Sequence, residues 1–173
     1  KSLAFQKSEY LLPKGSRIQL TVLASPSGSG TDDLTWSSSS PSIVTVDHSG
    51  TIHAKKKGRA TITVQSANGK SASVKIIVSQ VRLKVKTIRM QKGTSTTLLG
   101  IQSKYPATDQ VASWKSSNRK VATVNKKGKV TAKKKGSAKI TVTMKSGAKA
   151  SYKLLVTKKP VKTKKLRVPS KKL

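Results

Sequence analysis

The feature that most constrains the fold is an internal repeat of 78 residues. Trp36 and Trp114 lie 78 positions apart, and the same offset aligns other residues along most of the 173-residue chain without a gap. The aligned pairs are Gly15 and Gly93, Leu20 and Leu98, Gly50 and Gly128, Ala54 and Ala132, Gly58 and Gly136, Ile62 and Ile140, Val64 and Val142, Gly69 and Gly147, and Val78 and Val156. Because a fixed period indicates repeated structural units, the sequence predicts two homologous domains, 1–78 and 79–156.

The C-terminal segment 157–173 resembles the start of a third repeat. It repeats an apolar i, i+2 pair that opens both earlier units; the three pairs are Leu3 and Phe5, Val81 and Leu83, and Leu166 and Val168. We therefore expect 157–173 to be a basic linker that leads into the first strand of another repeat. The chain also begins at Lys1, with neither Met nor an apolar signal segment. We expect it to be an excised or processed piece of a longer protein.

Within each unit the apolar residues follow a period of two. Alternation at 180° per residue places side chains on one face of a half-buried β-strand, and no window shows a helical period. The alternating apolar positions of the first unit are Ile18, Leu20 and Val22; Leu34 and Trp36; Ile52 and Ala54; Ala60, Ile62 and Val64; and Ala72, Val74, Ile76 and Val78. We expect these side chains to face a core, and Thr61, Thr63 and Lys75 to face solvent.

Turn residues separate the predicted strands. The sequence predicts breaks at 13–15, 25–30, 49–50, 57–58 and 68–69, and Asn68–Gly69 is the strongest because a type I′ hairpin needs positive φ at both central residues. About seven short strands in 78 residues, with turns every 8 to 12, are typical of a Greek-key β-sandwich. The fold class predicted from the pattern is therefore all-β.

Four linked motifs of the second unit resemble the group-2 bacterial immunoglobulin-like domain. They are Trp114-Lys-Ser-Ser-Asn118, Val121-Ala-Thr-Val124, Gly128-Lys-Val-Thr-Ala132 and Gly136-Ser-Ala-Lys-Ile-Thr-Val142, and the first unit repeats them from Trp36 to Val64. The resemblance implies two tandem Ig-like Greek-key β-sandwiches. Domains of this family occur in bacterial surface proteins, adhesins of the intimin and invasin kind, cell-wall enzymes and phage structural proteins. Because the family occurs in proteins with such different roles, the resemblance implies a fold more firmly than a function.

The inventory of reactive side chains argues against an enzyme. The chain has no Cys, 2 His and 5 acidic residues, too few for most hydrolytic, acid–base or metal centres. His48 and His53 have no counterpart in the second unit, and the adjacent Asp32 and Asp33 supply too few of the six to eight oxygens that Ca²⁺ takes. We predict no catalytic residue, no metal site and no cofactor.

The aromatic residues are few, and most fall on core positions. Trp36 and Trp114 lie two positions from Leu34 and Ala112, so each should point to the same face of its strand, which we expect to be the core face. By the same alternation, Phe5 and Tyr152 should also point inward. Only Tyr10 and Tyr105 are expected to show a ring to solvent. Stacking of bases or sugars needs exposed aromatics in series, so the sequence disfavours such a platform.

The positive charge is distributed unevenly. The chain has a net charge of +32, and basic residues outnumber acidic ones by 10 to 4 in 1–78, by 19 to 1 in 79–156 and by 8 to 0 in 157–173. Lysine keeps β-proteins soluble and protects sheet edges, but a net charge of about 2 to 8 is enough for a small domain. Two explanations stay open: a polyanionic partner, or general cationicity suited to an anionic envelope.

The predicted polyanion contacts are lysines on turns and outward strand positions. They are Lys55, Lys56, Lys57, Lys126, Lys127, Lys129, Lys133, Lys134, Lys135, Lys139 and Lys153. Lysine offers hydrated point charges instead of planar bidentate forks, so these contacts would be driven by charge and would discriminate little between polymers.

The leading hypothesis is a non-catalytic fragment of a bacterial surface or envelope protein. Its tandem Ig-like units would form a stalk or adhesion module, alongside other Ig-like repeats of the same chain, and the basic second unit and tail would bind teichoic acid, an acidic polysaccharide or a host glycosaminoglycan. No stretch approaches the roughly 20 apolar residues of a membrane span, so we expect no membrane insertion.

Two alternatives have other locations or partners. The first is a purely structural Ig-like spacer or a decoration domain of a phage particle. The second is non-specific binding of nucleic acid through phosphate contacts, which ranks lower because the sequence shows neither a helix for the major groove nor a stacking surface.

Overall fold

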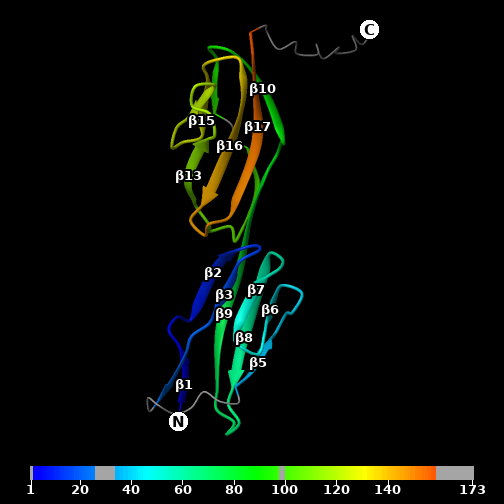
Figure 1. Ribbon diagram of the computed structural model, residues 1–173, viewed down its shortest axis with the longest axis vertical. Helices are drawn as coiled ribbons and strands as arrows, with labels where there is room; N and C mark the ends of the chain where they lie inside the picture. Colours follow the sequence, from blue (N-terminus) through cyan, green and yellow to red (C-terminus); the bar gives the residue numbers. More distant parts are fainter. Residues whose placement is uncertain (1, 26–33, 98–99, 159–173) are drawn as a thin grey trace, which may run out of the picture. The chain divides into compact units, whose positions relative to one another are not determined.

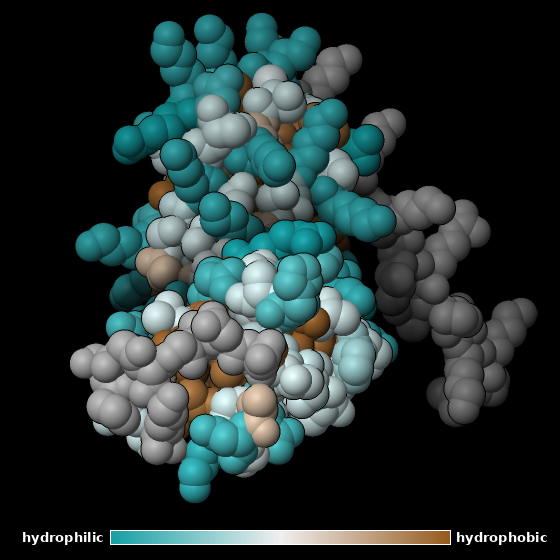
Figure 2. Space-filling view, turned by 60° about the horizontal axis from the view of Figure 1, so that its bottom comes forward, coloured by the Kyte–Doolittle hydropathy of each residue, from teal (hydrophilic) through white to brown (hydrophobic). Residues whose placement is uncertain are grey.

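The computed structural model describes residues 2–25, 34–97 and 100–158 (Figure 1). They form 17 β-strands and no helix, so the all-β prediction is confirmed. Within these ranges there is accordingly no helix able to cross a membrane. Hydrophilic side chains project from much of the face seen in Figure 2.

The larger sheet of the first repeat is centred on two long antiparallel strands, β8 and β9. They pair from Gly58 opposite Val78 to Gln65 opposite Ser71. β5 pairs antiparallel with β8, β2 runs parallel to the middle of β9, and β12 pairs antiparallel with the last residues of β9. The bounds of these strands are Glu9–Pro13 (β2), Thr35–Ser38 (β5), Gly58–Gln65 (β8), Ser71–Leu83 (β9) and Ile101–Tyr105 (β12).

Two smaller sheets complete the first repeat. One has three strands in the order β3-β7-β6, and the other is the antiparallel pair of β1 and β4. The bounds are Ser2–Phe5 (β1), Arg17–Gln19 (β3), Val22–Ser25 (β4), Val44–Val46 (β6) and Thr51–Ala54 (β7). The repeat has more strands than the seven predicted because its first two extended segments are each interrupted, giving β1 and β2 and then β3 and β4.

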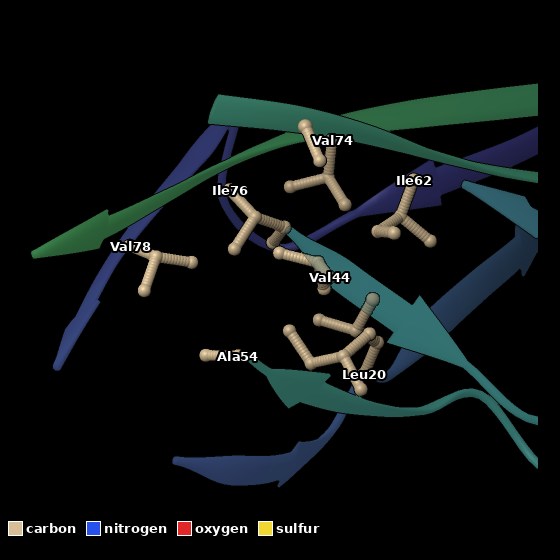
Figure 3. Close-up of a cluster of buried hydrophobic side chains, with 9 residues drawn as sticks. Leu20, Val44, Ala54, Ile62, Val74, Ile76 and Val78 are labelled. Carbon is tan, nitrogen blue, oxygen red and sulfur yellow. The ribbon is translucent and has the colours of Figure 1, made fainter. Parts of the chain in front are cut away.

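The core of the first repeat lies between β8 and β9 on one side and β6 and β7 on the other (Figure 3). It is built from the alternating apolar positions, and none of its members is more than 5% exposed: Leu20, Val44, Ile52, Ala54, Ala60, Ile62, Val74, Ile76 and Val78. The prediction that this parity faces inward is confirmed for these strands.

The second repeat has a four-stranded sheet in the order β10-β17-β16-β13 and a three-stranded sheet in the order β11-β15-β14. β10 runs parallel to β17, as β2 does to β9 in the first repeat. The bounds are Thr87–Gln91 (β10), Ser95–Thr97 (β11), Val111–Ser116 (β13), Ala122–Val124 (β14), Lys129–Ala132 (β15), Gly136–Met144 (β16) and Lys149–Thr157 (β17).

Close Cα atoms group the chain into two compact units that do not follow the repeats residue by residue. Of the described residues, one unit takes those within 2–84, 100–113 and 142–150, and the other takes those within 85–97, 114–141 and 151–158. Strand β9 also runs through position 78, where the sequence placed a boundary. The limits 1–78, 79–156 and 157–173 stay predictions.

Two local predictions are wrong. The turn at Asn68 closes one residue earlier than predicted, because the Gly69 N–H donates to Ser66 O at 2.9 Å. Its central residues are therefore 67 and 68, and Gly69 (φ +77°) follows them in the left-handed region. Ala112, expected to face the core, is exposed, as is its neighbour Val111 at 37%. Parity tells which face a side chain occupies, but not whether another sheet covers that face.

Each tryptophan packs against a glycine of a turn. Trp36 is half-buried against the core, and a Cβ built on Gly50 would lie 2.5 Å from its Cζ2 atom. In the second repeat, a Cβ on Gly128 would lie 3.2 Å from the ring of Trp114. Phe5 also contacts Trp36, with ring centroids 6.0 Å apart. Both tryptophans thus pack on turn glycines, and both are half-buried instead of fully enclosed in the core.

Candidate functional site

All eleven lysines predicted to contact a polyanion have exposed side chains. Strands fix three of them, Lys129, Lys139 and Lys153, and turns that follow β7, β14 and β15 carry the others. Exposure makes these ammonium groups available to a partner. It leaves open which of them act together, and that depends on the backbone that holds them.

The turn between β14 and β15 presents Lys126 and Lys127, and Lys129 follows as the first residue of β15. The Asn125 side-chain oxygen accepts the backbone N–H groups of Lys127 at 3.0 Å and Lys129 at 2.9 Å, and Gly128 adopts φ +78°. Side chains of this kind stabilise turns by bonding their own backbone. The lysine side chains take no part in the bonding and point to solvent.

The first repeat has the same turn with different charges. Asp47 accepts the N–H groups of Ser49 at 2.9 Å and Thr51 at 3.0 Å, and the hydroxyl of Ser49 at 2.6 Å. The bond from the Ser49 side chain, together with the Thr51 N–H, lowers the pKa of Asp47. An acid and polar residues thus occupy the positions that an amide and three lysines occupy in the second repeat.

The triple-lysine turns are anchored alike in both repeats. The N–H groups of Lys133 and Lys134 donate to Val121 O at 2.8 and 3.2 Å, and those of Lys55 and Lys56 donate to Ile43 O at the same two distances. The backbone of each turn is therefore held in place, and its charge is directed outward.

A groove on β16 and β17 brings together residues that are far apart in the sequence. It has a volume of about 660 Å³, and its lining residues are Lys86, Ser117, Ser137, Ala138, Lys139, Ser151, Tyr152 and Lys153. Of these residues, only Lys139 and Lys153 were predicted from the sequence as contacts. Outward parity was the available signal for Lys139 and Lys153, whereas Lys86 and Ser117 reach the groove only through strand pairing.

The carboxylates in the described part of the chain neutralise none of these lysines. Asp109, the one acidic residue of 79–156, is 4% exposed and accepts the N–H and hydroxyl of Ser146 at 3.2 and 2.6 Å. Across residues 2–25, 34–97 and 100–158 no ion pair is formed. The positive charge of the second repeat is therefore not neutralised by ion pairs with acidic residues among those described.

Several residues considered from the sequence lie elsewhere. Asp32, Asp33 and the tail beyond residue 158 lie outside the described residues. His48 is exposed and His53 is half-buried, and the described ranges contain no group of three or more His, Cys, Asp or Glu able to hold a metal.

The two tyrosines expected at the surface are half-buried. Tyr10 and Tyr105 each show part of the ring, and the Nζ atom of Lys7 lies 5.5 Å from the Tyr10 ring centroid. Tyr152 is 2% exposed, as its parity predicted.

Comparison with known families decides what these repeats are. The sequence model of the bacterial Ig-like domain (group 2) matches residues 1–76 and again residues 77–154. The chain belongs to the bacterial Ig-like domain (group 2) family. The resemblance seen in the four motifs is thereby confirmed, and the fold is a tandem of bacterial Ig-like domains.

Two curated relatives and one solved structure are similar to this Ig-like tandem. Lacto-N-biosidase of Bifidobacterium bifidum is 44% identical over 69 residues, which are 40% of this chain and 6% of that protein. An uncharacterised protein of Clostridium acetobutylicum is 28% identical over 152 residues, 84% of this chain and 16% of that protein. The chain thus spans a small fraction of these relatives.

The solved structure is a C-terminal 282-residue fragment of intimin in complex with the intimin-binding domain of its translocated receptor. It has a TM-score of 0.53 and 14% sequence identity, and the match covers 90% of this chain and 63% of that one. At this identity the likeness establishes the fold alone.

Proposed function

We propose that this Ig-like tandem is a non-catalytic stalk or adhesion module of a bacterial surface or envelope protein, and that its second repeat and tail bind an anionic polymer. Teichoic acid, an acidic polysaccharide and a host glycosaminoglycan all have the required chemistry. The family and the intimin-like fold support the module, and the charge of the second repeat supports the partner.

The proposal depends on one observation: the Asp47 turn and the Asn125 turn have the same backbone hydrogen bonds but carry different charges. A side-chain oxygen at Asp47 or Asn125 bonds the same backbone N–H groups, so the fold accepts either residue. Three lysines nevertheless surround Asn125, where they repel one another and pair with no acid in the described residues. Self-repulsion of this kind opposes the compact state, and a polyanion offsets it.

The test is binding of the full chain to polymers of known charge. Wild-type protein should bind heparin and teichoic acid at low ionic strength, should not bind uncharged dextran, and should lose affinity steeply as salt shortens the Debye length from about 30 to about 8 Å. Isothermal titration calorimetry measures the affinity at each salt concentration.

A matched pair of variants locates the contact. K126H/K127S/K129T gives the second repeat the residues of the first-repeat turn, and the control K7Q/K14Q/K70Q removes three charges from the first repeat. The turn variant should bind several-fold more weakly than the control. Equal affinities would show that only total charge matters, and absence of binding at low salt would eliminate the polyanion and leave the structural spacer.

A further inference from the structure

The groove on β16 and β17 has a counterpart at the same place in the first repeat. The first groove, of about 350 Å³, is lined by Glu9, Ser39, Arg59, Ala60, Thr61, Lys75, Ile76 and Ile77. The 78-residue offset places Ser39 on Ser117, Thr61 on Lys139 and Lys75 on Lys153. The two grooves are therefore one feature of the domain, present twice.

The charges of the two grooves differ. Glu9 opposes Arg59 and Lys75 in the first groove, which leaves a net charge of +1. The second groove has Lys86, Lys139 and Lys153 and no acid, so its charge is +3. The second groove is also the larger of the two. Its chemistry is that of an anion site, whereas the chemistry of the first is mixed.

The backbone fixes the segments that bear these lysines. The Lys153 N–H donates to Lys86 O at 2.8 Å, and the Lys139 N–H donates to the Ser117 hydroxyl oxygen at 2.9 Å. Ser117 in turn donates its own N–H to Lys139 O at 2.9 Å. The backbone of all three lysines is thus held on paired segments, and all three residues line the same groove.

The serines supply hydrogen-bond donors that the described part of the chain does not use. Ser137 and Ser151 form no side-chain hydrogen bond to other described residues, and Ser117 accepts one bond while its own hydroxyl proton is unused. A serine hydroxyl donates one bond and an ammonium group donates up to three. Several donors of both kinds, with no competing carboxylate, suit a ligand with several acceptor oxygens and a negative charge.

We infer that this groove is a subsite for one sulfate- or phosphate-bearing residue of the bound polymer. A tetrahedral oxyanion has three or four oxygens that can accept bonds from the lysines and the serine hydroxyls together. The groove is shallow and open to solvent, so a sugar or polyol unit can lie along it beside its anionic group. The inference rests on the proposed polyanion function and adds a discriminating contact to it.

The experiment follows backbone amide NMR signals of the full chain during titration. The probes are inorganic sulfate, inorganic phosphate, a sulfated oligosaccharide and a glycerol-phosphate oligomer, all at constant ionic strength set with chloride. Saturable shifts at Ser117, Lys139 and Lys153 are expected, larger than those at the first groove. A higher affinity for the sulfated probes or for the phosphate-bearing probes identifies which ester the groove binds.

A variant with unchanged net charge distinguishes this subsite from non-specific electrostatic binding of the polymer. S137A/S151A removes two donors from the groove, and its control S95A/S103A removes two exposed strand hydroxyls elsewhere. The groove variant should weaken oligosaccharide binding about fivefold or more, in line with lost bonds to a charged group, and the control should not.

The outcomes distinguish the subsite from the polyanion function. Unchanged affinity in S137A/S151A, or shifts spread over all lysine-bearing strands without saturation, would overturn the subsite and leave charge-driven binding standing. Absence of binding to any anionic oligomer at low salt would overturn both. Matching amide spectra of the free variants would show that each is folded.

Discussion

Alanine at Gly50 should destabilise the first repeat much more than alanine at Gly69. The two glycines have nearly the same backbone, with φ +81° and +77°. Their surroundings differ, because a Cβ at Gly50 would lie 2.5 Å from the Trp36 ring and a Cβ at Gly69 would meet nothing within 4 Å. The pair therefore separates the cost of positive φ from the cost of the steric clash.

The magnitudes follow from these two terms. A non-glycine residue in the left-handed region costs about 1 kcal/mol, and this applies to both variants. At Gly50 the indole ring cannot rotate away as a flexible chain would, and overpacking of this kind costs a further 1 to 3 kcal/mol, roughly. We expect losses of about 1 kcal/mol for Gly69→Ala and about 2 to 4 kcal/mol for Gly50→Ala.

The assay is urea unfolding followed by tryptophan fluorescence. Each repeat contains one tryptophan, so a Trp114→Phe background leaves Trp36 as the only reporter and isolates the first repeat. The second repeat offers an independent pair in a Trp36→Phe background: Gly128 has a ring atom at 3.2 Å, and Gly93 has nothing within 4 Å. Because 3.2 Å requires a smaller shift than 2.5 Å, the difference between these two variants should be smaller.

Equal losses for Gly50→Ala and Gly69→Ala would refute the reasoning. They would mean that the tryptophan yields without cost and is not part of a close-packed core. A larger loss at Gly93 than at Gly128 would refute it as well, since Gly93 has only the backbone term.

Other side chains give further expectations. Tyr152→Phe should keep stability or raise it by up to about 1 kcal/mol in urea unfolding, because the buried hydroxyl has no hydrogen-bond partner among the described residues; a loss of stability would contradict this. Burial raises the pKa of Tyr152, so wild-type stability should fall as pH rises above about 10, and that of the Phe variant should not. The Ser49 hydroxyl lowers the pKa of Asp47, so the stability contributed by Asp47 should be lost as pH falls below about 4; thermal melts of Asp47→Asn should lack this loss. Asp109→Ala should cost about 1 to 3 kcal/mol by leaving the part-buried Ser146 N–H without an acceptor, and Asp109→Asn should cost less.

The sequence predicts the core well because a sheet imposes a strict parity. Ile62, Val64 and Val74 each lie between two polar residues, and each is at most 1% exposed. Ala112 shows the limit of the same rule, since its side chain has the correct parity and is nevertheless exposed. The turn at Asn68 shows another limit: Asn-Gly indicates a turn, but the bond from Gly69 to Ser66 sets which residues are central.

The candidate site was only partly predictable, because a groove is a property of neighbouring strands. Outward parity identifies Lys139 and Lys153 from their own segments. Lys86 joins them because its carbonyl accepts the N–H of Lys153, and Ser117 joins them through two bonds with Lys139. Neither pairing has a signal in the local sequence. The number of lysines therefore identifies the charged domain, and the strand register identifies which of them line one groove.

The paired turns also bear on why the second repeat is so basic. If its lysines were needed to hold the fold, the first repeat would need equivalents at the same positions. It has His48, Ser49 and Thr51 there, on a turn held by the same two backbone bonds. Solubility does not require the excess either, because the first repeat has the same fold with far less charge. This contrast supports the proposal that the lysines serve something outside the domain, either an environment or a partner of negative charge. The two groove serines can separate these explanations, because an anionic environment acts on total charge alone and a bound ester group also needs hydroxyl donors.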